Sequence, residues 1–260
     1  MEIELLKQDK EKLSLFIKEV NPTLINTFRR LIIDEVPVMA IREVEFENNS
    51  SALNDEMLSH RLGLIPLKTD LKSYNLPAEC KCDGKGCARC QTTLTLDVKG
   101  PCTVYASDLK PKDKEIKPVY EKMPIVKLLK DQELKLIAYA SLGKGKEHSK
   151  YIPALVYYRA FPEFKIAECS SCNKCVEVCP TKILKLNDKK IEVKDYFNCI
   201  LCKACEDICP DKTIAVNGSK TDFIFFIENF GQLTFKEILS EASKIFDDKL
   251  NEFAKQIKKI

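Results

Sequence analysis

Twelve of the 13 cysteines in this chain of 260 residues fall into three groups of four. Two groups, residues 169–179 and 199–209, share the spacing C-x2-C-x2-C-x3-C and are each followed by proline. Three thiolates in one short loop can bind three corners of an iron–sulfur cubane, while the fourth cysteine is carried away to a second cluster. This pattern predicts the chemistry of a bacterial-type ferredoxin with [4Fe-4S] clusters.

The spacing also predicts which cysteines share a cluster, because the fourth cysteine of each run belongs to the other run's site. The two runs are offset by 30 residues, which indicates a duplicated unit. Zinc, or thiols paired as disulfides, is the alternative interpretation. One site is expected to use Cys179, Cys199, Cys202 and Cys205; the other is expected to use Cys169, Cys172, Cys175 and Cys209.

The third group has a different spacing, C-x-C-x4-C-x2-C, and no histidine close to it. Four soft ligands within a few residues suit a structural zinc ion, and glycines 84 and 86 permit the tight loop that such a site needs. Free thiols or a disulfide are the alternatives. The predicted zinc ligands are Cys80, Cys82, Cys87 and Cys90. Cys102 stands alone and is expected to be a small buried apolar residue.

Periodic patterns indicate the elements that must position these groups. Residues 3–6 and 13–17 alternate as a hairpin, and a helix should run from Asn21, its N-cap, to a stop at Pro37. A short helix at residues 57–62 is expected to end at Gly63. Further strands are expected at residues 39–46, 94–98, 134–138, 152–161 and 223–227.

The end of the chain carries the clearest helix signal. Thr234 and Glu237 form a capping box, with Leu233 and Ile238 placed as a hydrophobic staple. Apolar residues then recur every three or four positions up to Ile257, so one face is apolar for about six turns. Such a stripe belongs either to a core or to a partner interface.

Composition excludes several classes of protein. The formal net charge is +3, which argues against a dedicated nucleic-acid binder. The apolar runs are too short to span a bilayer, and the first residues do not form a signal peptide, so a cytoplasmic protein is expected. Nucleophile-elbow, Walker A and dinucleotide-binding motifs are missing from the sequence, and no catalytic residues are predicted.

Four segments outside the clusters resemble the D-subunit family of archaeal DNA-directed RNA polymerase. That family is related to the third-largest eukaryotic polymerase subunit and to the bacterial α N-terminal domain. The similar segments occur in family order: residues 21–41, residues 59–67 with the run HRLGLIPL, residues 143–153 with the run GKGKEH, and residues 226–233 before the long helix. Together they extend over nearly the whole chain.

The resemblance implies an α+β fold with nested insertions. Residues 1–38 and 222–260 would form a polymerase α-like dimerisation domain, residues 39–165 an inserted β-rich domain, and residues 166–221 a further ferredoxin-like insert. The 80–90 loop lies where the eukaryotic relatives bind zinc, although its middle gap is four residues here and three in those relatives. Family members with one cluster are most similar to this chain at Cys179, Cys199, Cys202 and Cys205, whereas the other site has alternatives: empty, closed by a disulfide, or a [3Fe-4S] form.

The implied function is a non-catalytic assembly subunit of DNA-directed RNA polymerase with iron–sulfur clusters, for which a purely structural role and a redox-responsive role are the two alternatives. Its partners would be the polymerase L subunit in a heterodimer, the N and P subunits, and the large catalytic subunits, and it would meet DNA only through the complex. The alternative is an electron-transfer subunit of a redox complex, which would leave the terminal helix without a role. The dimerisation surface is expected to include Leu24, Phe28, Leu31, Phe246, Leu250, Phe253 and Ile257.

Overall fold

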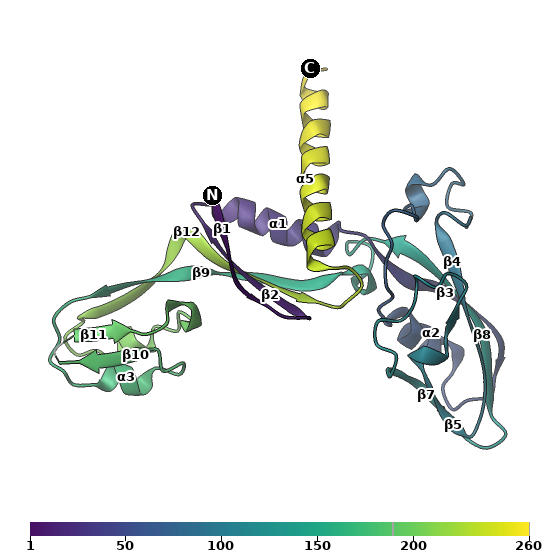
Figure 1. Cartoon of the computed structure of the whole chain (residues 1–260), viewed down its shortest axis with the longest axis horizontal. Coiled ribbons are helices and arrows are strands. Elements are labelled where there is room, and N and C mark those ends of the chain that lie inside the picture. The colour runs from purple at the N-terminus through teal and green to yellow at the C-terminus, as the bar shows by residue number, and fades with distance from the viewer. Residues whose placement is uncertain (189, 260) are drawn as a thin grey trace. The chain divides into compact units, whose positions relative to one another are not determined.

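A computed structural model describes residues 1–188 and 190–259 of the chain (Figure 1). The chain forms two compact units, and each unit combines two stretches that are distant in sequence. Unit 1 consists of Met1–Asn26 and Tyr157–Phe226, and unit 2 consists of Thr27–Val156 and Ile227–Ile260.

Unit 1 contains a four-stranded sheet in the order β1-β2-β12-β9. The predicted hairpin is confirmed, because β1 (Glu2–Gln8) pairs antiparallel with β2 (Lys12–Lys18). Asp9 closes the turn by accepting hydrogen bonds from the N–H groups of Glu11 and Lys12. The two partner strands are longer than predicted, because their pairing continues beyond the apolar runs: β9 covers Ala154–Ile166 and β12 covers Ile214–Asn229.

Between β9 and β12 the chain forms a small lobe that contains both four-cysteine runs, and Figure 1 shows the two strands leading to it. Five apolar residues form the core of the lobe together with four cysteines, so the cysteines supply much of its interior: Ile183, Leu184, Ile191, Ile214 and Val216, with Cys175, Cys179, Cys199 and Cys205. Its elements are α3 (Lys174–Val178), the antiparallel pair β10 (Leu184–Asn187) and β11 (Lys190–Val193), the 3-10 turn η4 (Tyr196–Asn198), and α4 (Ala204–Asp207).

Unit 2 is built on a second four-stranded sheet in the order β3-β8-β4-β6. Apolar side chains of its three long strands meet those of α2 in a large core, which includes Leu58, Leu62, Leu94 and Leu136. The strands are β3 (Val38–Asn49), β4 (Gln91–Lys99), β6 (Lys110–Pro111) and β8 (Glu133–Gly143), with a separate pair β5 (Cys102–Tyr105) and β7 (Pro124–Leu128). Three 3-10 turns are η1 (Pro77–Glu79), η2 (Ala106–Asp108) and η3 (Ser149–Tyr151).

Helix α2 (Asp55–Gly63) confirms the predicted short helix but not its expected ending. Gly63 is the last helical residue, and Leu64 follows as the C-cap in the right-handed region. The Leu64 N–H donates to the carbonyl groups of His60 and Arg61, so these backbone bonds end the helix without a left-handed glycine. Cys102 is only partly buried, and it packs against the core of unit 2.

The two predicted amphipathic helices are present as α1 (Pro22–Asp34) and α5 (Phe235–Ile257). Asn21 caps α1 by accepting from the N–H of Thr23 at 2.8 Å. The capping box of α5 is confirmed, since the Thr234 hydroxyl accepts from the Glu237 N–H while the Glu237 carboxylate accepts from the Thr234 N–H. Among the described residues, none of the helices is both long enough and apolar enough to cross a membrane.

Candidate metal centres

The two four-cysteine runs and the residues after them share a pattern of left-handed backbone positions. Left-handed residues recur at the 30-residue offset of the sequence repeat, and such conformations are uncommon outside glycine. Leu201 is the most unusual of them, because a bulky side chain rarely adopts positive φ. The three matched pairs are Ser171 with Leu201, Asn173 with Lys203, and Lys182 with Lys212. The duplication predicted from the cysteines therefore extends to the path of the chain.

Two small cavities lie in the described part of the lobe. Each cavity combines the first three cysteines of one run with the last cysteine of the other. The first is lined by Cys179, Cys199, Cys202 and Cys205, and the second by Cys169, Cys172, Cys175 and Cys209. These are the same two sets that the spacing predicts as ligands. Four thiolate donors around one cavity fit the coordination of an iron–sulfur cluster.

The two cavities differ in their surroundings. Apolar side chains of Phe164, Ile183, Leu184 and Val216 line the first cavity, and only Cys202 among its cysteines is exposed. The first cavity also has Thr181 and Lys203 in its lining. The second cavity is lined by Ile191 and Ile214 and by a larger share of polar residues, and one of its cysteines is buried. Those polar residues are Ser170, Asn173, Asp211 and Thr213. We call these sites the apolar cavity and the polar cavity.

Burial makes the free thiols resist ionisation. It raises the pKa of Cys205 to about 11, and it also raises the pKa values of Cys175 and Cys199. A metal must displace these thiol protons when it binds. Binding at either cavity therefore releases protons.

The last cysteine of each run differs because it has a threonine beside it. The Thr213 hydroxyl, 3.5 Å from Cys209 Sγ, lowers the pKa of that thiol. For Cys179 the effect of burial is outweighed by hydrogen bonds from Thr181 and from the backbone that follows, so its pKa is lowered too. These threonines were missed at the sequence level, although both follow a Cys-Pro pair within a few residues.

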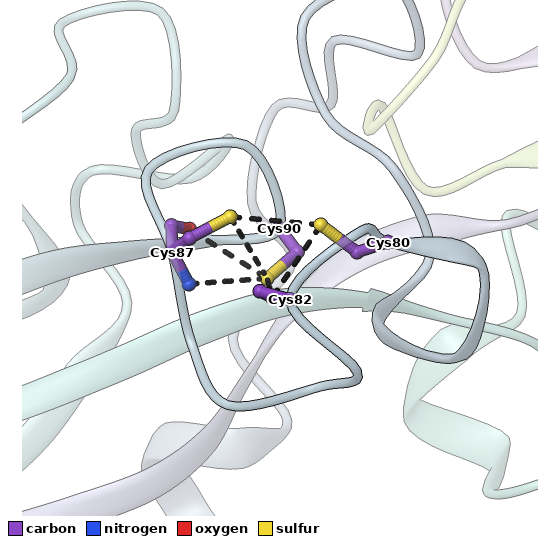
Figure 2. A group of neighbouring side chains, drawn as sticks. All are labelled: Cys80, Cys82, Cys87 and Cys90. Carbon is purple, nitrogen blue, oxygen red and sulfur yellow. Dashed lines mark hydrogen bonds between the residues drawn. The ribbon is translucent and has the colours of Figure 1, made fainter.

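The third cysteine group also converges, as Figure 2 shows. The ligand sulfur atoms all lie within 4.8 Å of one another. Cys82 Sγ lies 3.5 Å from the sulfurs of both Cys80 and Cys90, and the sulfurs of Cys87 and Cys90 are 3.8 Å apart. A tetrahedron of Zn–S bonds of about 2.3 Å places its sulfurs about 3.8 Å apart. The geometry thus fits a zinc ion, and the separations are far longer than an S–S bond of about 2.05 Å.

The loop that carries this group makes two glycine turns. Gly84 and Gly86 both adopt positive φ, at 76° and 85°. Hydrogen bonding from the Cys90 thiol lowers the pKa of Cys82 to about 6, whereas burial raises the pKa of Cys90 to about 12. Cys82 is therefore the thiol that loses its proton more readily than Cys90 when a cation binds.

A cluster of charges in unit 2 was also missed by sequence reasoning. The Glu35 carboxylate follows α1 and pairs with Lys144, Lys146 and Lys249 at 3.4, 3.4 and 3.1 Å. Burial raises the pKa of Glu35, but the three lysines outweigh this effect and leave the pKa below its usual value. These residues come from three segments distant in sequence, so no local pattern links them. The two glycines of the predicted GKGKEH loop bracket the first of these lysines.

Comparison with known protein families divides the chain into two matched spans. Residues 44–154 match the family described as the RNA polymerase Rpb3/RpoA insert domain. Residues 168–214 match the family described as the 4Fe-4S dicluster domain. The second span contains both four-cysteine runs, and the first contains the Cys80–Cys90 group.

Curated relatives match over nearly the full length. A protein of Archaeoglobus fulgidus is 38% identical and covers 100% of this chain and 98% of its own length. Proteins of Methanothermobacter thermautotrophicus and Methanosphaera stadtmanae are 39% and 36% identical, and each comparison covers 96% of both chains. All three relatives are named DNA-directed RNA polymerase subunit Rpo3.

Proposed function

This chain belongs to the family of the DNA-directed RNA polymerase subunit Rpo3, and from that premise we propose that it is a non-catalytic assembly subunit of the polymerase. The observation that carries the proposal is the full-length similarity, which includes the segments on both sides of the cluster lobe. If the chain were an electron carrier, we would expect its similarity to known proteins to be limited to the cluster lobe, without the flanking segments. The lobe is therefore part of a polymerase subunit and supplies it with iron–sulfur sites.

We further propose that the chain is the D subunit of an archaeal polymerase, related to the eukaryotic third-largest subunit and to the bacterial α N-terminal domain. In this proposal residues 1–38 and 222–260 form the dimerisation domain, residues 39–165 the first insert and residues 166–221 the second. Its partners are the L subunit, the N and P subunits, and the large catalytic subunits. It acts in the cytoplasm, where archaeal transcription takes place.

The heterodimer surface in this proposal uses the end of α5. Leu250, Phe253 and Ile257 are 50%, 63% and 52% exposed and lie on one face of the helix. Phe28 of α1 packs edge-on against Phe246 of α5, with ring centroids 6.2 Å apart, so both helices contribute to this region. Leu31 is buried within the chain and is therefore removed from the predicted contact surface.

Replacing Phe253 with aspartate tests this surface, because a charge placed in an apolar interface prevents its burial. We expect Phe253→Asp to abolish co-purification with the L subunit. Lys255→Asp is the matched control, since it adds an acid on the same helix at an exposed polar position. Full retention of the L subunit by Phe253→Asp would place the heterodimer surface elsewhere.

Reconstitution tests the assembly function itself. Polymerase reconstituted from its other subunits should fail to assemble when this chain is left out, and the chain by itself should polymerise no nucleotides. A polymerase that assembles normally without the chain would refute the proposed function. A tagged chain that retains a reductase rather than large polymerase subunits would favour the electron-transfer alternative.

We propose that the apolar and polar cavities each hold one [4Fe-4S] cluster, bound by the four cysteines that line each cavity. A cluster of this kind supplies four strong Fe–S bonds that tie distant parts of the lobe together. Anaerobic iron and sulfide analysis should give about eight irons per chain for two clusters and about four for one. A single occupied site would be the apolar cavity, with the polar cavity empty, closed by a disulfide, or holding a [3Fe-4S] form.

We also propose that Cys80, Cys82, Cys87 and Cys90 bind one structural zinc ion. The support is the tetrahedral spacing of their sulfurs and the closed set of four thiolates. Purified protein should contain about one equivalent of zinc that withstands dialysis at neutral pH, since such sites bind tightly. Less than about half an equivalent, with four freely titrating thiols, would refute the site.

A further inference from the structure

A group of aromatic side chains connects one of the two cysteine runs to the sheet of unit 1. Phe16 of β2 lies against Phe161 of β9, with ring centroids 4.7 Å apart. Phe197 of η4 contacts both rings, at 5.4 and 5.5 Å. Tyr196, the neighbour of Phe197, stacks on Phe161 and contacts Phe164 edge-on. We call these five residues the aromatic clasp.

The clasp meets the apolar cavity at two points. Phe164 lines that cavity. Residues 196 and 197 belong to the 3-10 turn whose C-cap is Cys199, and the Cys199 N–H donates to the Tyr196 carbonyl at 3.2 Å. A ligand of the apolar cavity is thus joined directly to the turn that contacts β2.

The turn has few other supports. It is a single 3-10 turn, which is too short to be stable by itself. Asp195 caps it by accepting from the Phe197 N–H at 2.8 Å, and the Arg159 guanidinium of β9 donates to the Phe197 carbonyl. Tyr196 and Phe197 are 42% and 36% exposed, whereas Phe16 is 6% exposed beneath them. Release of the turn would therefore uncover an aromatic side chain of the sheet.

The other cysteine run has no counterpart of the clasp among the described residues. At the 30-residue offset, Tyr196 and Phe197 correspond to Ile166 and Ala167. The contacts there are polar and stay within the lobe: the Ala167 N–H donates to the Thr213 carbonyl, and the Ser170 hydroxyl pairs with Asp211. Two loops with the same left-handed positions thus differ in their connection to the sheet.

From these contacts we propose that the aromatic clasp makes the stability of the β1–β2 hairpin depend on occupancy of the apolar cavity and not of the polar cavity. The proposal rests on the cluster ligands assigned above. An occupied apolar cavity fixes Cys199, which holds η4 in place, and Phe197 then covers Phe16 on β2. Without the cluster, η4 is released and the hairpin loses its aromatic cover.

Hydrogen exchange of the full-length chain, measured anaerobically together with iron content, tests this dependence. Cys202→Ser and Cys172→Ser form a matched pair, because each replaces the exposed cysteine of its own cavity. Both variants should lose about half of the iron. Amides of residues 12–18 should exchange roughly tenfold faster in Cys202→Ser, since several aromatic contacts are lost, and at the wild-type rate in Cys172→Ser.

A second pair of variants leaves every cysteine in place. In Phe197→Ala the iron content should be unchanged, and the amide hydrogens of residues 12–18 should still exchange roughly tenfold faster. Phe197→Tyr should behave as wild type because it keeps the ring. Tyr120→Ala, an aromatic residue of unit 2 with 42% exposure, is the control and should change neither quantity.

The outcomes separate this inference from the proposed function. Unchanged exchange in Phe197→Ala, or equal acceleration in the two serine variants, overturns the clasp while the ligand sets stand. A Cys202→Ser chain that keeps all its iron overturns the ligand set of the apolar cavity, and the occupancy dependence with it. Loss of half the iron with unchanged exchange of residues 12–18 overturns the clasp alone.

Discussion

The cluster lobe and the Cys80–Cys90 loop both gather cysteines, but the cysteines contribute to the interior of the protein in different ways. In the lobe, four cysteines form part of the core itself, beside only five buried aliphatic residues. In the loop, Cys80 and Cys90 are also buried, but none of the four cysteines belongs to the large core of unit 2. Cysteine side chains therefore form part of the core of the lobe, whereas in the Cys80–Cys90 loop they converge on one another outside the core of unit 2. A small domain that buries little apolar surface needs such covalent or metal support.

Removal of all metal should produce the largest difference between the two regions. We expect the lobe to unfold completely, because the cluster bonds replace apolar burial there, while the sheet of unit 2 stays folded. Hydrogen exchange would show full loss of protection at residues 183–187 and retained protection at residues 134–142. A metal-free lobe that keeps its protection would contradict this account of its core.

The two cavities of the lobe should differ next in how quickly they release iron. We expect a chelator to reach the ligand sulfurs of the polar cavity more easily, because one of its cysteines is buried, whereas the apolar cavity has three buried cysteines. Anaerobic chelation should remove iron from Cys202→Ser, which keeps only the polar site, at least about fivefold faster than from Cys172→Ser, a difference of about 1 kcal/mol in the barrier. Equal rates would show that burial of the sulfurs does not protect the cluster.

A smaller effect is expected from a change in the glycine turn of the loop. Gly86→Ala places a side chain at a φ of 85° and brings its Cβ against the end of Gln91. The backbone strain should cost about 1 kcal/mol and weaken zinc binding roughly fivefold, with iron content unchanged. Competition with a zinc chelator measures the change in zinc affinity. Lys85→Ala, in the same loop but without positive φ, should bind zinc as wild type does.

The smallest effect concerns charges instead of metal. The lowered pKa of Glu35 means that its stabilising effect is present above its unfolded pKa of about 4.5 and is lost as the pH falls through its folded value. Glu35→Gln should therefore reduce the stability of unit 2 by about 1 kcal/mol at pH 7, because the three lysines are partly exposed. The difference from wild type should shrink below about pH 4.5, as measured by urea unfolding at each pH. A difference that is constant with pH would exclude the ion pairs as its cause.

Several features of this protein were determined by sequence alone, because their causes are local. The cysteine spacing predicted the two sets that line the apolar and polar cavities, since three ligands of each set lie in one loop. The capping box predicted the start of α5, and alternation predicted the β1–β2 hairpin. The third cysteine group was likewise visible from its spacing, and its four sulfurs converge.

Other features were decided only by the tertiary structure, because they join segments that are distant in sequence. The sheet order β1-β2-β12-β9 places strands from both ends of the chain side by side, and no local pattern specifies such pairing. The charge cluster at Glu35 and the clasp between Phe16 and Phe197 likewise join segments that are distant in sequence. The difference in burial between two nearly identical cysteine runs arises in the same way, because the side chains around a loop, and not its own spacing, set its exposure to water.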